Sequence, residues 1–289
     1  MSENTQLQKK LKSPVQFKIL GDNEQIGGAG DFTHTRLPLL HSSISKLSEG
    51  SFGEIFEITK ATGEKRILKI VPVGDTDPQT KQLQLTFKDI TAEISASVEL
   101  AKLLHDKRNH CPSFPRIYRV CVVQDTFPET AIKAWKAYSS SNSTYHPSPD
   151  AYKPDQAFIT IETESAGKSL ENYLVGSYLK AISIFKQVAL AVAVAEEKLE
   201  FEHRDLHVEN ILIKECAEKK LDFKLRNQKF SVETYGVKAT IIDFTYSRIM
   251  TGDGVKYLNL DNIYDPRSRS PDEFLDHRYV YARMGEMTQ

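Results

Sequence analysis

The stretch His203-Arg204-Asp205-Leu206-His207-Val208-Glu209-Asn210 decides the fold of this chain of 289 residues. It matches the pattern H-R-D-L-x-x-x-N, whose five fixed residues arise by chance in a chain this long on the order of once in ten thousand. In such a loop, the carboxylate of Asp205 can accept a proton from an attacking hydroxyl, and Asn210 can turn back to a magnesium ion. A polar capped turn after a helix would explain the same residues more simply. The spacing favours phosphoryl transfer over that alternative.

A second acidic residue lies downstream in Asp243-Phe244-Thr245, directly after the apolar strand Thr240-Ile241-Ile242. A carboxylate at this place offers hard oxygen ligands to a magnesium ion that bridges phosphates. An aspartate that ends a strand is common by itself, but here it follows the other motifs in the order that phosphoryl transfer requires. Asn210 and Asp243 are therefore the predicted metal ligands and part of the predicted nucleotide site.

A glycine-rich segment lies upstream, in Ser48-Glu49-Gly50-Ser51-Phe52-Gly53-Glu54-Ile55. Two glycines three residues apart, in a turn between two strands, let backbone N–H groups approach phosphate oxygens without a clash at Cβ. Ser48 occupies the place of the first glycine in a G-x-G-x-x-G pattern, and an ordinary hairpin turn would have a similar sequence. The residues that we predict to contact the nucleotide here are Gly50, Ser51, Phe52, Gly53 and Ile55.

Lys69 is the only charged residue of Ile67-Leu68-Lys69-Ile70, on the strand that follows the glycines. A lysine on a half-buried strand usually extends its ammonium to solvent. This lysine can instead direct its ammonium to the phosphates, and it then needs a carboxylate to hold it. Glu93 flanks the apolar stripe of the next predicted helix and is the predicted partner, with Asp89 and Glu99 as alternatives.

The order of the predicted elements indicates an α+β chain with two lobes, a strand-rich part followed by a helix-rich part. Period-two and period-three-to-four patterns, with the turn residues between them, predict these elements. They are a hairpin of Ile55–Ile58 and Arg66–Val73, a helix over Leu85–Leu104, strands at Ile117–Val123 and Ala157–Glu162, a short helix at Leu170–Tyr178, a long helix over Leu179–Glu200, a strand at Ile211–Lys214 and a hairpin within Phe230–Phe244.

The predicted domain organisation is a flexible leader over residues 1–40 and a protein kinase domain over 41–289, with an N-lobe at 41–163 and a C-lobe at 167–289. Pro128–Gln156, whose second half is rich in Ser, Asn, Pro and Tyr, is expected to be a surface excursion within it. Only 46 residues follow Asp243. Because helices average about 11–12 residues, we expect a helical C-lobe that is cut short.

Composition excludes several classes of protein. The hydrophobic fraction is 40% and the charged fraction 27%, as in globular proteins. With 38 Lys and Arg against 39 Asp and Glu, the net charge is -1, so we predict no direct DNA binding. The longest apolar run, Val188–Ala195, is far shorter than the roughly 20 residues of a membrane span. Three cysteines without metal-ligand spacing predict reduced thiols in the cytosol or nucleus.

Together, the glycines, Lys69, the catalytic loop and Asp243 specify a protein kinase. His207 stands where most protein kinases have a lysine, Asp243-Phe244-Thr245 replaces D-F-G, and no A-P-E tripeptide follows. In these features the chain resembles the haspin family of atypical protein kinases over roughly Ile44 to Asp261. Further segments that resemble this family are Gly50-Ser51-Phe52-Gly53-Glu54, Lys133-Ala134-Trp135, Phe201–His207 and Thr251-Gly252-Asp253-Gly254.

The resemblance implies a Ser/Thr kinase that uses ATP and Mg²⁺ and phosphorylates the third residue, a threonine, of the histone H-three tail in mitosis. It implies a monomer in the nucleus on chromosomes, with chromatin as a partner and the cytoplasm as the alternative location. The resemblance also implies residue roles: Lys69 holds phosphates and pairs with Glu93, Asp205 is the base, and Asn210 and Asp243 bind magnesium. Glu164 and Ala166 would offer hinge backbone to adenine, behind Thr163. The residues implied to lie near the substrate peptide are His207, Asp253 and Asp261.

Two alternatives remain open at this point. The short C-terminal part and the loss of the first glycine favour a catalytically weak or inactive kinase-like binding module. A small-molecule phosphotransferase shares the catalytic aspartate, the asparagine and the later aspartate, but such enzymes seldom carry an intact H-R-D-L-x-x-x-N.

Overall fold

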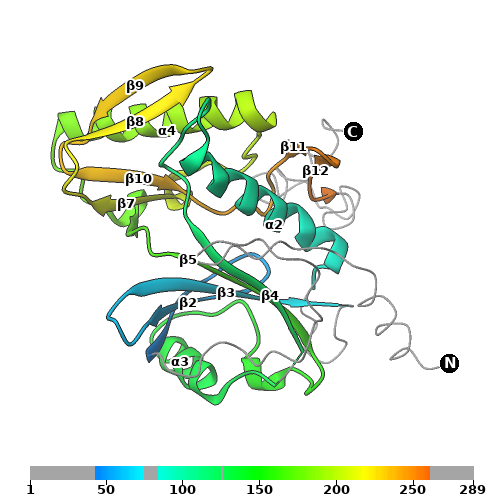
Figure 1. Ribbon diagram of the computed structural model, residues 1–289. Helices are drawn as coiled ribbons and strands as arrows, with labels where there is room; N and C mark the ends of the chain where they lie inside the picture. The colour runs from blue at the N-terminus through cyan, green and yellow to red at the C-terminus, as the bar shows by residue number, and fades with distance from the viewer. Residues whose placement is uncertain (1–42, 75–83, 125, 261–289) are drawn as a thin grey trace, which may run out of the picture. The chain divides into compact units, whose positions relative to one another are not determined.

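The computed structural model describes residues 43–74, 84–124 and 126–260, which fall into two compact units (Figure 1). The first unit combines the chain up to Thr86 with Pro115–Ser165, and the second combines Phe87–Phe114 with the chain from Ala166 onward. The first unit is dominated by a sheet and the second holds the two longest helices, which confirms the predicted α+β class. The predicted leader, residues 1–40, lies outside the described residues.

A five-stranded antiparallel sheet forms the first unit, with the strand order β1-β2-β3-β5-β4. The predicted hairpin is confirmed, because β2 and β3 are joined by a turn in which Gly63 has a φ of +83°, a conformation that favours glycine. The two later strand predictions are confirmed as well. The strands are β1 (Ser43–Glu49), β2 (Glu54–Thr59), β3 (Lys65–Val73), β4 (Ile117–Gln124) and β5 (Ala157–Glu164).

Helix α3 (Glu129–Ser139) packs against β1 in the first unit, followed by the short 3-10 helix η2 (Pro149–Ala151). Ala131 and Trp135 are buried on its inner side. The prediction of a surface excursion over Pro128–Gln156 is therefore wrong for its first half. The segment is part of the fold because Ala131 completes an apolar cluster beneath the sheet, formed with Phe56, Ile58, Leu68, Ile70, Val123, Phe127 and Phe158.

Both long helices of the second unit agree with the predicted helices. Helix α2 (Phe87–Lys102) continues into the 3-10 helix η1 (Leu103–His105), and α4 spans Tyr178–Leu199. The hydroxyl of Ser177 caps α4 by accepting a hydrogen bond from the N–H of Lys180. The predicted short helix Leu170–Tyr178 is reduced to the 3-10 turn η3 (Leu170–Asn172). By its contacts α2 groups with the second unit, and the predicted lobe limits stay predictions.

The strands of the second unit form one small sheet, in the order β10-β7-β6, and two hairpins. The predicted hairpin within Phe230–Phe244 is wrong, because its first strand pairs with an earlier strand, β8, and its second strand pairs with β7. The elements are β6 (Lys168–Ser169), the 3-10 turn η4 (Val208–Asn210), β7 (Ile211–Glu215), β8 (Lys220–Leu225), β9 (Gln228–Glu233), β10 (Val237–Ile241), β11 (Ile249–Thr251) and β12 (Gly254–Lys256).

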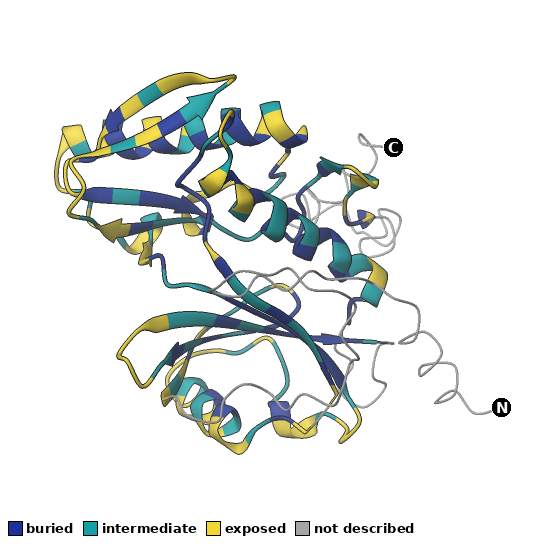
Figure 2. Ribbon diagram, viewed as in Figure 1, coloured by how far each residue is buried: buried dark blue, intermediate teal, exposed yellow. Residues whose placement is uncertain are grey.

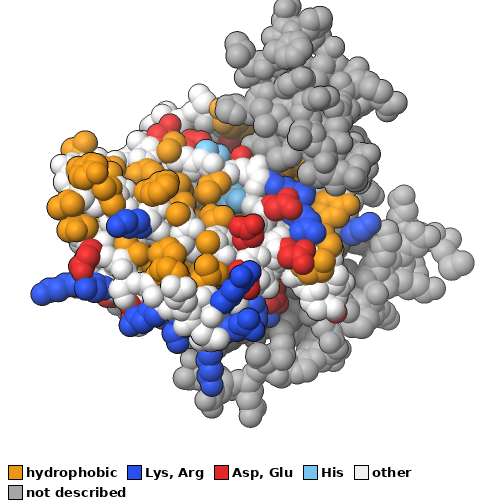
Figure 3. All heavy atoms as spheres, turned by 90° about the horizontal axis from the view of Figure 1, so that it is seen from above, with side chains coloured by type: hydrophobic (Ala, Val, Ile, Leu, Met, Phe, Trp, Pro, Cys, Tyr) orange, Lys and Arg blue, Asp and Glu red, His pale blue; other side chains and the backbone are white. Residues whose placement is uncertain are grey.

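Helix α4 is the central helix of the second unit and is buried along one side (Figure 2). By length and composition it could also cross a membrane, but core helices meet the same criterion. Its buried Gln187 accepts a hydrogen bond from the N–H of Ala239 and donates one to the carbonyl of Val237, both on β10. These contacts make α4 a core helix. Its other side exposes Tyr178, Leu179 and Phe185. Figure 3 shows hydrophobic side chains gathered on one part of the molecular surface.

Candidate active site

The glycine-rich turn and Lys69 lie together in the first unit. The N–H of Gly50 donates to the carbonyl of Gly53 (2.8 Å), which closes the turn. A Cβ on Gly53 would lie 2.4 Å from the carbonyl oxygen of Ile70, so no larger residue fits there. A Cβ on Gly50 would lie 3.6 Å from Cε of Lys69, and Ile55 is the cross-strand partner of Lys69. The predicted phosphate loop therefore lies next to the predicted phosphate-binding lysine.

Of the other two residues of this turn, Phe52 is buried and Ser51 is exposed. Phe52 is 5% exposed, so its buried side chain anchors the middle of the turn. The turn thus combines a buried residue, Phe52, with an exposed one, Ser51, where an anion could approach a backbone N–H.

The predicted adenine-binding residues follow the end of β5. Thr163 pairs with Ile67 and Glu164 with Arg66 of β3. The N–H of Glu164 donates to the carbonyl of Arg116 (3.1 Å), so a contact from Glu164 to adenine would use its carbonyl. Ala166, where the chain enters the second unit again, is buried. The hinge roles of Glu164 and Ala166 stay predictions.

His203 anchors the catalytic loop in the second unit. Its Nδ1 accepts a hydrogen bond from the N–H of Asp205 (3.3 Å), and its Nε2 donates to the carbonyl of Ile242 (3.0 Å). This pair of bonds requires a neutral ring with its proton on Nε2. Burial lowers the pKa of His203, although the bond to Ile242 and the charges of Asp243 and Asp205 act in the opposite direction. A neutral histidine thus holds the backbone of the predicted base.

Arg204 lies next to the base in a strained backbone conformation, with a φ of 64°. Left-handed conformations of residues other than glycine cost about 1 kcal/mol or more and are frequent at active sites. The guanidinium of Arg204 is paired with the carboxylate of Glu202, with Nε 2.9 Å and Nη2 2.8 Å from Oε2. The charge of this arginine is therefore balanced within the described chain.

Asn210 connects the catalytic loop with the strand that leads to Asp243. Its Nδ2 donates to the carbonyl of Asp205 (3.0 Å), which orients Oδ1 as the amide atom that could ligate a cation. Its backbone carbonyl accepts from the N–H of Ile242 (3.0 Å). Because Ile242 precedes Asp243, this bond brings the two predicted metal ligands to one place. Carboxylate and amide oxygens fit magnesium.

His207 lies beside both Asp205 and Asn210. Its Nε2 is 3.0 Å from Nδ2 of Asn210 and 3.8 Å from Oδ1 of Asp205. Nδ1 of His207 accepts a hydrogen bond from the N–H of Glu209 (3.3 Å), and Nδ2 of Asn210 faces the other ring nitrogen. A neutral ring has a single acceptor nitrogen, so it accepts from one of these two donors at a time. His207 is therefore a neighbour of the predicted base, and its contact with a substrate stays a prediction.

Asp243, Thr245 and Glu93 form a hydrogen-bonded group in the second unit. Oγ1 of Thr245 lies 2.7 Å from Oδ1 of Asp243 and 3.0 Å from Oε2 of Glu93. Glu93 is buried, whereas Glu99, one alternative to it, pairs with Lys102 at the helix surface. Asp89, the other alternative, is half-buried in the first turn of α2. We did not predict Thr245 as a site residue, although its place in Asp243-Phe244-Thr245 was a signal.

Three further predictions concern residues that the structure does not bring into this group. Lys69 belongs to the first unit and Glu93 to the second, so their pairing stays a prediction. Asp253 lies in the exposed turn between β11 and β12, where its N–H donates to Oγ1 of Thr251. Asp261 lies outside the described residues.

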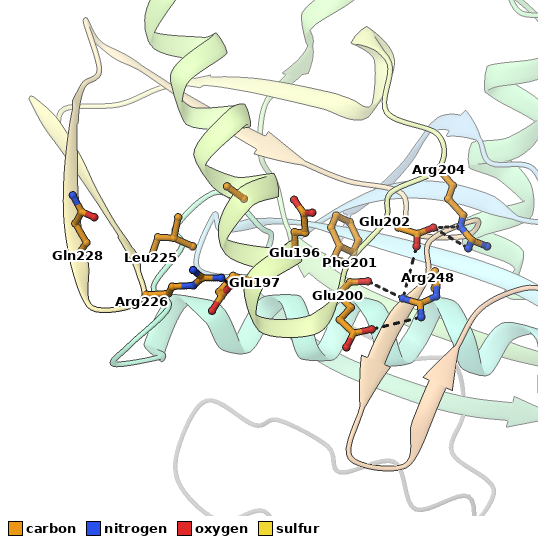
Figure 4. Close-up of a pocket in the computed structure, with 11 residues that line it drawn as sticks. Glu196, Glu197, Glu200, Phe201, Glu202, Arg204, Leu225, Arg226, Gln228 and Arg248 are labelled. Atoms are coloured by element: carbon orange, nitrogen blue, oxygen red, sulfur yellow. Dashed lines mark hydrogen bonds and ion pairs between the residues drawn. The ribbon is translucent and has the colours of Figure 1, made fainter. Parts of the chain in front are cut away.

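A cavity of about 1110 Å³ lies behind the catalytic loop in the second unit (Figure 4). Its wall contains none of the predicted site residues. It is rich in charge, and most of these charges form ion pairs, since Arg248 contacts Glu200 and Glu202 and Arg226 contacts Glu197. The cavity is therefore separate from the predicted chemistry.

One chain combines a glycine-rich turn next to a lysine on a strand with an H-R-D-L-x-x-x-N loop next to an aspartate at the end of a strand. The fold and the site therefore define a protein kinase domain. A family model described as "Haspin like kinase domain" matches residues 6–266, and the chain belongs to this family.

Curated relatives agree with this family. The chain is 36% identical over 244 residues to the serine/threonine-protein kinase haspin of Bos taurus, which covers 83% of the chain and 30% of the relative. It is 36% identical over 206 residues to the protein of the same name from Mus musculus, covering 71% and 27%. It is 31% identical over 214 residues to a haspin homolog of Drosophila melanogaster, covering 72% and 38%. The chain thus spans well under half the length of these relatives.

Proposed function

We propose that this chain is a Ser/Thr protein kinase that transfers the γ-phosphoryl group of ATP to a hydroxyl group of a protein. The observation that carries the proposal is the hydrogen bond from the N–H of Ile242 to the carbonyl of Asn210 (3.0 Å). It joins the loop that holds Asp205 to the strand that ends at Asp243. A base and two oxygen ligands for a metal therefore lie within one small region, as phosphoryl transfer requires.

Each residue of this region has a role in the proposed reaction. The carboxylate of Asp205 accepts the proton of the attacking hydroxyl. The backbone of Asp205 is held by His203 and by Asn210, so this carboxylate keeps its place relative to the metal ligands. Magnesium, held by Asn210 and Asp243, would neutralise charge on the phosphates when bound.

The first unit supplies the proposed nucleotide contacts. The backbone of Gly50–Gly53 cradles phosphates, and Lys69, whose stem lies beside Gly50, adds a positive charge. Glu93 would pair with Lys69 and the backbone of Glu164 and Ala166 would bind adenine. These assignments are supported by the order of the motifs and by the family to which the chain belongs.

The proposed substrate is a basic protein segment, and we favour the threonine near the start of the histone H-three tail. The relatives are named as serine/threonine-protein kinases, and the resemblance to the haspin family supports the histone. His207 beside the base and the exposed Asp253 offer a polar and an acidic contact to such a segment. Asp261 would add a second carboxylate. On this basis we propose a nuclear, chromosome-associated monomer.

A phosphate-transfer assay tests the proposal. Purified protein is incubated with magnesium, ATP and either the histone H-three tail peptide or the same peptide with its third residue changed to alanine. We expect transfer to the first peptide, and Asp205→Asn should lower the rate by about 10² or more because proton acceptance is lost. Asp222→Asn is the matched control, since Asp222 lies on β8 and pairs with Lys229.

The possible results separate the alternatives. No transfer above that of Asp205→Asn would overturn the proposal. If ATP with magnesium raises the melting temperature without any transfer, the chain is a kinase-like binding module. Equal transfer to both peptides would retain a protein kinase but reject the third-residue threonine as its target.

A further inference from the structure

A buried ionic cluster lies at the base of the glycine-rich turn, in the first unit. The side chain of Lys46, on β1, is fully buried, and its ammonium contacts the carboxylates of Glu49 (2.8 Å) and Glu54. Glu49 and Glu54 are the last cross-strand pair of β1 and β2, so they enclose Gly50–Gly53. One ammonium group therefore connects the two ends of the turn.

A bulge in β1 makes this arrangement possible. Lys46 pairs with Phe56 and Ser48 with Ile55, so Leu47 is an extra residue on β1. Leu47 is directed to solvent, with 46% of its surface exposed. Without the extra residue, alternation along the strand would place Lys46 and Glu49 on opposite faces of the sheet. The bulge returns Lys46 to the face that carries Glu49.

The cluster needs a cation, because two carboxylates directly opposite each other destabilise a sheet. Burial acts to raise the pKa of Glu49, but the hydrogen bonds from Lys46 and from the N–H of Tyr145, with the charges of Lys46 and His146, hold it below its usual value. Glu49, Glu54 and His146 also have ligand atoms within 4.8 Å of one another, the spacing of a metal site. The ammonium of Lys46 fills that place, so the cluster is an ionic contact and not a metal site.

Helix α3 and the loop after it, about ninety residues further along the chain, enclose the cluster. The N–H of Tyr145 donates to Glu49 (2.6 Å), and Nδ1 of His146 lies 3.2 Å from Oε1 of Glu54. The rings of Trp135 and Tyr138, both on α3, lie 5.3 and 5.0 Å from the ammonium of Lys46, within the range of cation–π contacts. Helix α3 and the loop after it therefore hold both ends of the glycine-rich turn.

We propose that Lys46 is a positioning residue that keeps the glycine-rich turn in its phosphate-binding conformation before the nucleotide arrives. The inference rests on the proposed function, because the benefit is tighter binding of ATP. A turn that needs no ordering on binding loses less conformational freedom, so its affinity for phosphates is higher. If loss of the contact leaves about one tenth of the molecules with the turn in place, the apparent affinity falls about tenfold.

Two variants separate this role from a general effect on folding. Lys46→Met removes the ammonium but leaves two buried carboxylates, which can prevent folding. Lys46→Met with Glu54→Leu removes the ammonium together with one of its two carboxylates, and Glu49 keeps the hydrogen bond from the N–H of Tyr145, so this variant should fold better than the single variant. Lys65→Met is the matched control, because Lys65 pairs with Glu57 between β2 and β3 and its side chain is 59% exposed. Lys46→Arg keeps the positive charge, so its exchange rates and its KM for ATP should stay close to those of the wild type.

The first measurement is hydrogen exchange of the backbone amides of Gly50–Glu54 in the protein without nucleotide. We expect exchange at least about tenfold faster in the double variant and wild-type rates in Lys65→Met. The second is the KM for ATP, which should rise about tenfold in the double variant with little change in kcat, since the chemical groups are intact. A partly unfolded variant would instead lower kcat at constant KM.

The two proposals fail in different ways. Unchanged exchange of Gly50–Glu54 in a folded double variant would overturn the role of Lys46, whatever the activity. Faster exchange with an unchanged KM for ATP would also overturn it, because the turn would then be held without benefit to binding. If the wild-type protein binds no ATP, the proposed function fails, and the role of Lys46 fails with it even where exchange is faster.

Discussion

The hydroxyl of Thr245 lies 3.0 Å from Oε2 of Glu93, so Thr245 is hydrogen-bonded to a buried carboxylate of α2. The same hydroxyl lies 2.7 Å from Oδ1 of Asp243. A hydroxyl has one proton, so it donates to one of these carboxylates at a time. Asp243 has a φ of 62°, a conformation that few residues other than glycine adopt. The bond from Thr245 thus helps to hold a strained aspartate in place.

Thr245→Val removes this hydroxyl and leaves a side chain of similar size in a buried position. We expect the free energy of unfolding to fall by about 1–3 kcal/mol, because buried carboxylate oxygens lose a donor. Activity should fall as well, since Oδ1 of Asp243 loses the hydrogen bond from the hydroxyl and keeps the longer one from the N–H of Thr245 (3.3 Å). Thr245→Ser keeps the hydroxyl and should restore both quantities. Urea denaturation and the transfer assay check this, and a Thr245→Val protein as stable and active as wild type would contradict it.

The stability of the protein should fall in mild acid because of His203. Burial keeps the pKa of His203 below its ordinary value, so below about pH 6.5 the unfolded chain takes up a proton that the native ring does not. The contribution of His203 to the free energy of unfolding is fully present above that pH. It is lost as the pH falls toward the pKa of the native ring, by up to about 1.4 kcal/mol per pH unit.

His203→Gln isolates this contribution, because an amide can accept from the N–H of Asp205 and donate to the carbonyl of Ile242 without titrating. Urea denaturation at pH 7.5, 6.5 and 5.5 should give a smaller loss of stability with falling pH for the variant than for the wild type. Parallel curves for the two proteins would show that another group causes the loss.

Periodicity predicted most of the fold, and its failures have local causes. The apolar spacing of α4 and the dense β-branched residues of β3 were sufficient by themselves. The hairpin of β8 and β9 was missed because Arg226 and Asn227 form its turn with positive φ values of 52° and 69° but without a glycine. The alternation of Leu221, Phe223 and Leu225 in β8 was a usable signal.

The sequence predicts those parts of the site whose residues lie close together along the chain. It does not predict contacts that the fold makes between residues far apart in the sequence. The loop from His203 to Asn210 is one continuous motif. The contact of Glu54 with His146 joins residues 92 positions apart, and no spacing rule connects them. Helix α3 was obscured by the Ser- and Pro-rich residues after it, although Ala131, Trp135 and Tyr138 have helical spacing.

The two glycines of the phosphate loop should differ in their tolerance of substitution. Gly53→Ala would place Cβ 2.4 Å from the backbone oxygen of Ile70, so we expect a loss of about 1–3 kcal/mol of stability. Gly50→Ala meets nothing closer than 3.6 Å and should fold normally. Thermal unfolding of the two variants checks this. Equal melting temperatures would mean that the backbone of Ile70 moves away freely.

The three thiols should differ in reactivity. Complete burial raises the pKa of Cys111 to about 12, so this thiol is neither accessible nor ionised at pH 8. Cys121 and Cys216 are partly exposed. Titration with a thiol reagent at pH 8 should therefore modify at most two cysteines in the native protein and all three in urea. Rapid modification of Cys111 in the folded protein, identified by peptide mapping, would contradict its buried position.

Asn210→Asp tests whether the amide, and not only an oxygen ligand, is required. The variant keeps an oxygen for magnesium but replaces the donor to the carbonyl of Asp205 with a carboxylate, which repels that carbonyl. We expect kcat to fall by about tenfold or more, since a cost of about 1.4 kcal/mol in the placement of the base corresponds to that factor. Asn172→Asp is the matched control, because Asn172 is exposed and donates to Ser169. A magnesium titration of the rate should show that saturating metal does not restore Asn210→Asp, whereas full recovery at high magnesium would show that Asn210 serves only as a ligand.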